Sequence, residues 1–194
     1  MASNLRKKLP SATTLQIHDV NAAACQRFID EFSSHGKIEV ALSPRDLASR
    51  CSMVLSSLPA GPEVRQVYLD PENGIIAASQ DADRLMIECS TIEIEATQEI
   101  GQTVMKAGLG NFVDATVSGG VWGAIGGTLS FMVGHAEPSE SDMVGKHILE
   151  TLSLVGTPEK IQFRGGLGMG QVAKIAHNYV SATIWLQPRE WHWA

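Results

Sequence analysis

The segment Asp114-Ala-Thr-Val-Ser-Gly-Gly-Val-Trp-Gly-Ala-Ile-Gly-Gly-Thr-Leu-Ser-Phe-Met-Val-Gly134 carries the clearest structural signal in this sequence. Apolar stretches at 111–115 and 128–133 predict two short strands on either side of a glycine-dense turn. Because adjacent glycines such as Gly119 and Gly120 tolerate positive φ, the backbone of this turn can come close to a bound molecule. The segment therefore predicts a strand, turn and strand unit within a sheet.

The same turn has the features of an anion site. Ser118, Gly119 and Gly120 lead into a short apolar stretch at 121–125 that predicts the start of a helix. The first N–H groups of a helix have no partners inside it, so they can bind a carboxylate or a phosphate. An ordinary glycine turn in a sheet explains the spacing equally well.

A second segment, Gly168-Met-Gly-Gln-Val-Ala-Lys-Ile-Ala-His-Asn178, contains the candidate catalytic side chains. Lys174 and Asn178 are four residues apart, so on a helix they share one face, a single turn apart. Their neighbours are largely apolar, and a poorly solvated lysine has a lowered pKa and can act as an acid or base near neutral pH. The alternative is an ordinary surface lysine on an amphipathic helix.

Together the two segments resemble the β-hydroxyacid dehydrogenase family. The residues that match its substrate-binding motif are Asp114, Val117-Ser118-Gly119-Gly120, Ala124 and Gly127-Thr128-Leu129. Those that match its catalytic G-x-x-x-K-x-x-x-N motif are Gly170, Lys174 and Asn178. Thr116 departs from the pattern, because the family usually has proline there. The resemblance extends over nearly all of the chain, to about residue 184.

The resemblance implies a reaction and a role for each motif residue. The reaction is the NAD-dependent oxidation of 3-hydroxyisobutyrate to methylmalonate semialdehyde, a step of valine catabolism. Ser118, Gly119 and Gly120 would hold the carboxylate of the substrate. Lys174 would act as general acid and base on the substrate hydroxyl, and Asn178 would orient the substrate.

Other members of the family remain as alternatives. The 6-phosphogluconate branch shares the Ser-Gly-Gly element, but it usually has proline where this chain has Thr128, so the 3-hydroxyisobutyrate branch fits better. The tartronate semialdehyde branch is also close. A different alternative is a truncated product that has no activity.

Composition limits the class of protein. The chain has 194 residues, 44% of them hydrophobic, which suits a domain with a buried core. A net charge of −6 argues against a nucleic-acid partner, and no apolar run approaches the length of a membrane span. The three cysteines, Cys25, Cys51 and Cys89, lack metal-ligand spacing, so no metal site is expected.

The order of apolar and amphipathic stretches predicts an α/β fold. Short apolar strands alternate with helices, and this pattern is typical of a mostly parallel sheet covered on both faces. Strands are expected at 14–19, 40–42, 53–58, 85–89, 111–115, 128–133 and 156–163. Helices are expected at 1–9, 22–32, 43–50, 62–68, 94–107, 121–125 and 139–152. The fold class is therefore a doubly wound, Rossmann-like domain.

Four residues are candidates for binding NAD. Asp19 ends the first predicted strand, where a carboxylate can accept hydrogen bonds from the adenosine ribose and would repel the 2′-phosphate of NADP. A turn or helix-cap role for this aspartate is the alternative, shared with Asn21. Leu58 and Pro59 match the family's loop after the fourth strand, and Thr91 matches its hydroxyl beside the nicotinamide. These loops follow strands, where ligands bind in open α/β sheets.

The resemblance implies that the sequence starts beyond the first strand and glycine-rich phosphate loop of the family. The glycines at 166, 168 and 170 are similar to the cofactor-binding pattern G-x-G-x-x-G, but they do not match it, because Gln171 occupies the position of the third glycine. We expect residues 1–164 to form an incomplete NAD-binding domain. Residues 165–194 would begin the helix that enters an all-helical domain and end in a divergent tail. Such a polypeptide is expected to bind NAD weakly and to lack turnover by itself.

Location and assembly are expectations from the same resemblance. The basic, hydroxyl-rich stretch 1–15 superficially resembles a transit peptide, but the comparison favours the second half of the family's first helix. The family implies the mitochondrial matrix, or the cytoplasm if no upstream targeting segment exists. The expected partner is a small 3-hydroxy acid, without nucleic acid or membrane, and the family forms homo-oligomers through its helical domain.

Overall fold

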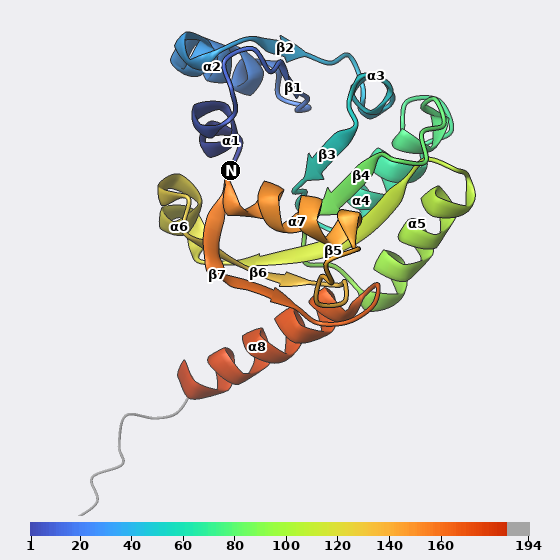
Figure 1. Ribbon diagram of the computed structural model, residues 1–194, viewed down its shortest axis with the longest axis vertical. Coiled ribbons are helices and arrows are strands. Elements are labelled where there is room, and N and C mark those ends of the chain that lie inside the picture. Colours follow the sequence, from blue (N-terminus) through green and yellow to red (C-terminus); the bar gives the residue numbers. More distant parts are fainter. Residues whose placement is uncertain (186–194) are drawn as a thin grey trace, which may run out of the picture.

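The computed structural model describes residues 1–185 (Figure 1). The strands are β1 (Leu15–Ile17), β2 (Ile38–Val40), β3 (Met53–Ser56), β4 (Leu85–Glu88), β5 (Asn111–Ser118), β6 (Leu129–Val133) and β7 (Gly156–Phe163). The α-helices are α1 (Ala2–Lys8), α2 (Ala22–Phe32), α3 (Pro44–Arg50), α4 (Gly61–Leu69), α5 (Ile94–Lys106), α6 (Gly120–Gly126), α7 (Met143–Ser153) and α8 (Met169–Trp185). Two 3₁₀ turns, η1 (Ser33–His35) and η2 (Ile75–Ala77), complete this part of the chain.

Five strands form the main sheet in the order β3-β4-β5-β6-β7. All neighbouring pairs are parallel except β5 and β6, which are antiparallel. Helices cover both faces, because successive side chains of a strand point to opposite sides. On β4, Met86 belongs to the core under α4 and α5, whereas Ile87 belongs to the core under α7. The predicted α/β fold with a mostly parallel sheet is confirmed.

The β5–α6–β6 unit contains the segment that dominates the sequence. Gly119, Gly120 and Gly127 have φ of 130°, 61° and 65°, a region in which side chains other than glycine are strained. This short helical connection reverses the chain and pairs Ser118 with Ser130, so the two strands are antiparallel. Strand β5 is also longer than the predicted range 111–115. Its first half pairs with β4 and its second half pairs with β6.

Strands β1 and β2 form a separate, parallel two-stranded sheet (Figure 1). Strand β2 lies at Ile38–Val40 and not at the predicted 40–42. The reason is local, because the N–H of Leu42 donates to the Asp46 carboxylate at 3.0 Å and so belongs to the turn that starts α3. Ser43 caps the same helix by accepting from the N–H of Asp46.

Helix α1 contacts the rest of the chain through two buried polar side chains. The Asn4 amide donates to the carbonyl of Ala124 in α6 at 2.8 Å. The Arg6 guanidinium is fully buried and donates to several backbone carbonyls, among them Thr13 at 2.6 Å and Pro10 at 2.7 Å. These bonds tie the predicted first helix to both the β1 segment and the glycine-rich unit.

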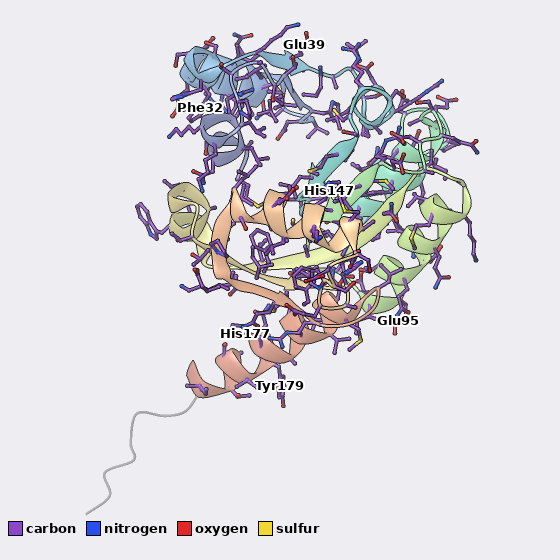
Figure 2. All side chains as sticks on the ribbon, in the orientation of Figure 1. Phe32, Glu39, Glu95, His147, His177 and Tyr179 are labelled. Atoms are coloured by element: carbon purple, nitrogen blue, oxygen red, sulfur yellow. The ribbon has the colours of Figure 1, made fainter. Side chains whose placement is uncertain are left out.

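Helix α8 packs at its start against β5 and β6 and extends away from the rest of the chain at the bottom of Figure 1. Its outer half is exposed, and the labelled side chains of His177 and Tyr179 stand out from it in Figure 2. The divergent tail predicted from residue 184 onward lies outside the described residues, except for residues 184–185 at the end of α8. No helix within residues 1–185 is long and apolar enough to cross a membrane, and no group of metal-ligating side chains occurs in that range.

Candidate cofactor and catalytic site

Two loops at the carboxyl ends of β3 and β4 lie against each other. The N–H of Leu58 donates to the hydroxyl oxygen of Ser90 at 2.7 Å, so the loop after β3 is fixed to the loop after β4. Leu58 is half-buried, while Pro59 and Thr91 are exposed beside it. A shallow hollow of about 300 Å³ opens next to these loops. It is lined by Ala60, Gly61, Thr91, Ile92, Glu93 and Ile175.

A buried carboxylate supports both loops from below. Glu88, the last residue of β4, accepts from the N–H of Ser90 at 2.6 Å and from the hydroxyl of Ser56 at the end of β3. Ser56 is bonded in turn to the Tyr68 hydroxyl at 2.8 Å. Burial raises the pKa of Glu88, against the opposing effect of these hydrogen bonds. The titratable groups near it, Tyr68 and Cys89, are buried with raised pKa values and stay neutral.

The raised pKa of Glu88 predicts a dependence of stability on pH. Above its ordinary value of 4.5 the unfolded chain has released this proton, whereas the folded protein still holds it up to the raised pKa. The free energy of unfolding should therefore fall as pH rises through this window. Glu88→Gln keeps an acceptor for the Ser90 N–H and has no proton to lose, so its stability should not contain this component.

Urea unfolding of the wild-type protein and of Glu88→Gln at several pH values measures the effect. We expect the stability of the wild type, relative to the variant, to decline from about pH 4.5 upward. Asp114 has a raised pKa as well, but it is present in both proteins and cancels in the difference. A stability difference that is constant with pH would contradict a raised pKa at Glu88.

Asp114 fixes the start of α8. Its carboxylate, buried on β5, accepts from the N–H of Gly168 at 2.7 Å and of Gln171 at 2.9 Å. These are N–H groups at the beginning of a helix, which have no intrahelical acceptors. Burial raises the pKa of Asp114, and the backbone hydrogen bonds act in the opposite direction. Asp114 is thus a helix cap that joins the first sequence motif to the second.

Gly170 and Thr116 complete this contact. A Cβ on Gly170 would lie 2.6 Å from an Asp114 carboxylate oxygen and against the Met132 carbonyl, so glycine is required by close approach of the backbone. The Thr116 hydroxyl donates to the Gly170 carbonyl at 3.0 Å. The threonine that departs from the family pattern therefore makes a buried hydrogen bond to the helix that carries Lys174.

Lys174 and Asn178 lie on α8, as the spacing predicts. Lys174 is half-buried, and desolvation by this burial lowers its pKa. Asn178, one turn further along, is exposed. The next residue after Lys174, Ile175, borders the hollow beside Thr91, so this helix lies next to the loop expected to face the nicotinamide.

The Ser-Gly-Gly element lies at the end of β5. Ser118 is half-buried on the strand, and Gly119 and Gly120 are exposed where α6 begins. Because Thr116 on the same strand is bonded to Gly170, the strand that leads to Ser118 runs beside the start of α8. The structure therefore places the predicted substrate-binding and catalytic segments on adjoining elements.

Asp19 stands apart from the other candidates. It is exposed at the end of β1, in the separate two-stranded sheet, and its carboxylate accepts from the N–H of Asn21 at 2.8 Å. Asn21 caps α2 by accepting from Ala23 and Ala24. Asp19 therefore has the turn role considered from the sequence. Its hydrogen bond to the N–H of Asn21 uses one of the two carboxylate oxygens of the exposed side chain. Binding of a ribose by Asp19 stays a prediction.

Sequence reasoning did not identify three residues that hold the site together. Glu88, Ser90 and Gln171 are all buried and connect the loops after β3 and β4 with α8. Polar residues within otherwise apolar stretches are a weak signal of such a network, because buried polar groups are almost always hydrogen-bonded. The contacts that join separate elements connect Leu58 to Ser90 across 32 residues and Ser90 to Gln171 across 81, and no local pattern reveals them.

The fold and these loops define the class of α/β dinucleotide-binding domains, in which ligands bind at the carboxyl ends of parallel strands. Residues 1–156 match the family described as the NAD binding domain of 6-phosphogluconate dehydrogenase, and the chain belongs to that family. The cofactor expected from the sequence, NAD, agrees with this description.

Relatives with similar sequences are dehydrogenases. The chain is 37% identical over 147 residues to 3-hydroxyisobutyrate dehydrogenase of Pseudomonas aeruginosa, covering 74% of this chain and 46% of that protein. It is 34% identical over 182 residues to the mitochondrial 3-hydroxyisobutyrate dehydrogenase of Homo sapiens, covering 94% of this chain and 49% of that protein. A solved structure of the Mycobacterium tuberculosis 3-hydroxyisobutyrate dehydrogenase with L-serine has a TM-score of 0.68 at 28% identity, covering 88% of this chain and 60% of that one.

The chain spans about half the length of the curated relatives it matches. Of the residues predicted to bind NAD, Asp19 is exposed after β1 and Thr91 borders the hollow, so both are accessible to a ligand. In dinucleotide-binding domains the phosphates of the cofactor bind at a glycine-rich turn between the first strand and the first helix. Residues 1–185 contain no such turn before α1, so they show no binding site of this kind for the two phosphates. Binding of NAD by the loops after β1, β3 and β4 stays a prediction.

Proposed function

We propose that this chain is the cofactor-binding part of an NAD-dependent dehydrogenase that oxidises the primary hydroxyl of a small 3-hydroxy acid, with 3-hydroxyisobutyrate as the substrate. The observation that carries the proposal is the attachment of α8 to the site. Asp114 and Gly170 hold the start of α8, the helix that carries Lys174, against β5, and Ile175 of the same helix borders the hollow beside Thr91. A proton-transfer group beside a cofactor loop is what such a reaction requires.

The roles of the chain's own residues follow from their positions. Gly119 and Gly120 are exposed where α6 begins, so their N–H groups, with Ser118, are suited to bind the substrate carboxylate. Lys174, with its lowered pKa, would accept the hydroxyl proton during oxidation and return it during reduction. Asn178 on the same helix face would orient the substrate. When bound, the nicotinamide supplies the acceptor for the hydride.

Serine is a second candidate substrate, because a solved relative was crystallised with L-serine. Serine is itself a 3-hydroxy acid with a carboxylate and a primary hydroxyl, so the same groups could bind it. The 6-phosphogluconate and tartronate semialdehyde branches stay as further alternatives. The remaining alternative is a truncated product without activity.

Turnover is tested in a protein that also contains the part of the relatives that this chain does not span, since the chain spans about half of their length. Production of reduced nicotinamide would be measured with 3-hydroxyisobutyrate, L-serine and 6-phosphogluconate. We expect kcat/KM for 3-hydroxyisobutyrate to exceed that for 6-phosphogluconate by at least roughly a hundredfold, since a site built to hydrogen-bond particular groups can discriminate by up to about 10⁴–10⁵. A preference for 6-phosphogluconate would refute the proposed substrate class. Absence of turnover with all three would support the inactive alternative.

Asp19 is expected to select NAD over NADP. Val20 beside it is fully exposed, so the double change Asp19→Ser with Val20→Arg removes a carboxylate and adds a phosphate partner without disturbing a core. The ratio of kcat/KM with NADP to that with NAD should rise by about tenfold or more. The matched control is Val20→Arg alone, which keeps the carboxylate. An unchanged ratio in the double variant would mean that Asp19 serves only the turn to Asn21.

Domain organisation, location and assembly belong to the same proposal. We infer that residues 1–164 form the NAD-binding part and that α8 leads out of it. Tyr179, Val180 and Ile184 are 72%, 54% and 67% exposed on this helix, which supports coverage by further protein in a homo-oligomeric dehydrogenase. A mitochondrial location is supported by the name of the human relative. Cytoplasmic location is the alternative, which imaging of the tagged protein would distinguish.

A further inference from the structure

One amide side chain connects the Thr91 loop to the Lys174 helix. Gln171 is fully buried in the first turn of α8. Its carbonyl oxygen accepts from the N–H of Ile92 at 3.1 Å, and its amide nitrogen donates to the carbonyl of Ser90 at 2.9 Å. Thr91 is therefore held from both sides by a residue about 80 positions further along the chain.

The backbone of Gln171 is fixed as firmly as its side chain. Its N–H donates to the Asp114 carboxylate at 2.9 Å, and the carbonyl of the preceding Gly170 accepts from Thr116 at 3.0 Å. Because both its backbone and its side chain are hydrogen-bonded, the rotamer of Gln171 cannot change without breaking buried hydrogen bonds. The position of the Thr91 loop is therefore fixed relative to α8. Lys174 lies one helical turn beyond it, on the same side of α8.

The bonds made by Ser90 extend this connection to the third element of the site. Its hydroxyl accepts from the N–H of Leu58, and its own N–H donates to Glu88. The loop after β3, the loop after β4 and the start of α8 thus meet at Ser90. Gln171 makes the direct side-chain link between α8 and this junction.

We propose that Gln171 is a positioning residue that sets the place of Thr91 relative to Lys174, and so aligns the proton-transfer group with the nicotinamide end of the cofactor. The inference rests on the proposed function for its catalytic meaning. Its structural part, that the amide holds the Thr91 loop to α8, stands on the hydrogen bonds alone and can be tested in the chain without cofactor.

The experiment compares Gln171→Met with Gln98→Met. Methionine has nearly the shape of glutamine without its hydrogen bonds. Gln98 is a matched control, because its amide also reaches the segment before α8, donating to the Leu167 carbonyl at 3.3 Å, but makes no hydrogen bond to residues 90–92. Hydrogen exchange of the Ile92 N–H is read in the 194-residue chain, with thermal unfolding measured in parallel.

Gln171→Met should speed exchange at Ile92 by roughly tenfold or more, while amides in β4 and β5 change little. Gln98→Met should leave Ile92 protected. Gln171→Glu keeps the acceptor for Ile92 and loses the donor to Ser90, so it should restore part of the protection. A uniform acceleration of exchange across the whole sheet would indicate a merely structural role and overturn the inference, as would an unchanged rate at Ile92.

Kinetics of the whole protein separate this inference from the proposed function. Gln171→Met should lower kcat by about tenfold or more with little change in the KM for NAD, since the groups are present but misaligned. If Lys174→Ala retains activity, the proposed function fails whatever Gln171 does. If Lys174→Ala is inactive and Gln171→Met has wild-type kcat, only the positioning role of Gln171 is overturned.

Discussion

Lys174→Ala is expected to lower kcat for 3-hydroxyisobutyrate by about 10² to 10⁴, the usual contribution of proton transfer by a positioned side chain. The lysine is half-buried on α8, and burial lowers its pKa toward the range in which it can exchange protons near neutral pH. NAD affinity should stay nearly unchanged, because the candidate cofactor contacts lie on other elements, at Asp19, Leu58, Pro59 and Thr91. Steady-state kinetics and calorimetric titration with NAD measure the two quantities.

Lys106→Ala provides the matched control for this prediction. Lys106 is an exposed helical lysine in the last turn of α5, so its removal takes away the same charge and the same methylene chain. It should leave kcat within a factor of about two, as is normal for surface substitutions. Retention of more than about a tenth of wild-type kcat by Lys174→Ala would exclude the lysine as the proton-transfer group.

Gly170→Ala is expected to lower the free energy of unfolding by about 1–3 kcal/mol, the usual effect of adding a methyl group where there is no space. The new Cβ would meet a carboxylate oxygen of Asp114 at 2.6 Å and the Met132 carbonyl. Neither can move freely, since Asp114 is bonded to the start of α8 and Met132 belongs to β6. The start of α8 would have to shift away from β5, and the contacts that place Lys174 would be lost.

Helix propensity opposes this loss but is too small to offset it. Alanine is more favourable than glycine by roughly 0.5–1 kcal/mol in the middle of a helix, and Gly170 lies at its beginning, where the gain is smaller. The net effect should be a fall in Tm of about 2–4 °C for each kcal/mol lost. Activity should fall as well, because α8 carries the candidate catalytic residues.

Gly166→Ala is the control, because a Cβ there meets no atom within 4 Å and the residue lies in the loop just before α8. It should change the free energy of unfolding by less than about 0.5 kcal/mol. Thermal unfolding of the two variants beside the wild type distinguishes a tight contact from a general effect of glycine loss. A Gly170→Ala protein as stable as the wild type would show that Asp114 and β6 can relax around the methyl group.

The sequence by itself determined the alternation of strands and helices and the positions of the two motifs. Those features depend on local rules: apolar spacing sets the elements, and glycines mark the turn at Gly119 and Gly120. The placement of Lys174 and Asn178 on one helix also follows from local spacing. The family resemblance indicated the cofactor, and the match of residues 1–156 to a family of NAD-binding domains agrees with it.

Tertiary structure alone decided how the motifs are joined and which strands pair. The antiparallel pairing of β5 with β6, and the separation of β1 and β2 from the main sheet, depend on which backbone edges meet in space. The contacts that assemble the site connect Asp114 to Gly168 and Gln171 to Ser90, across 54 and 81 residues. Buried polar groups must find partners wherever the folded chain brings them, so their identity is set by the three-dimensional arrangement and not by local sequence.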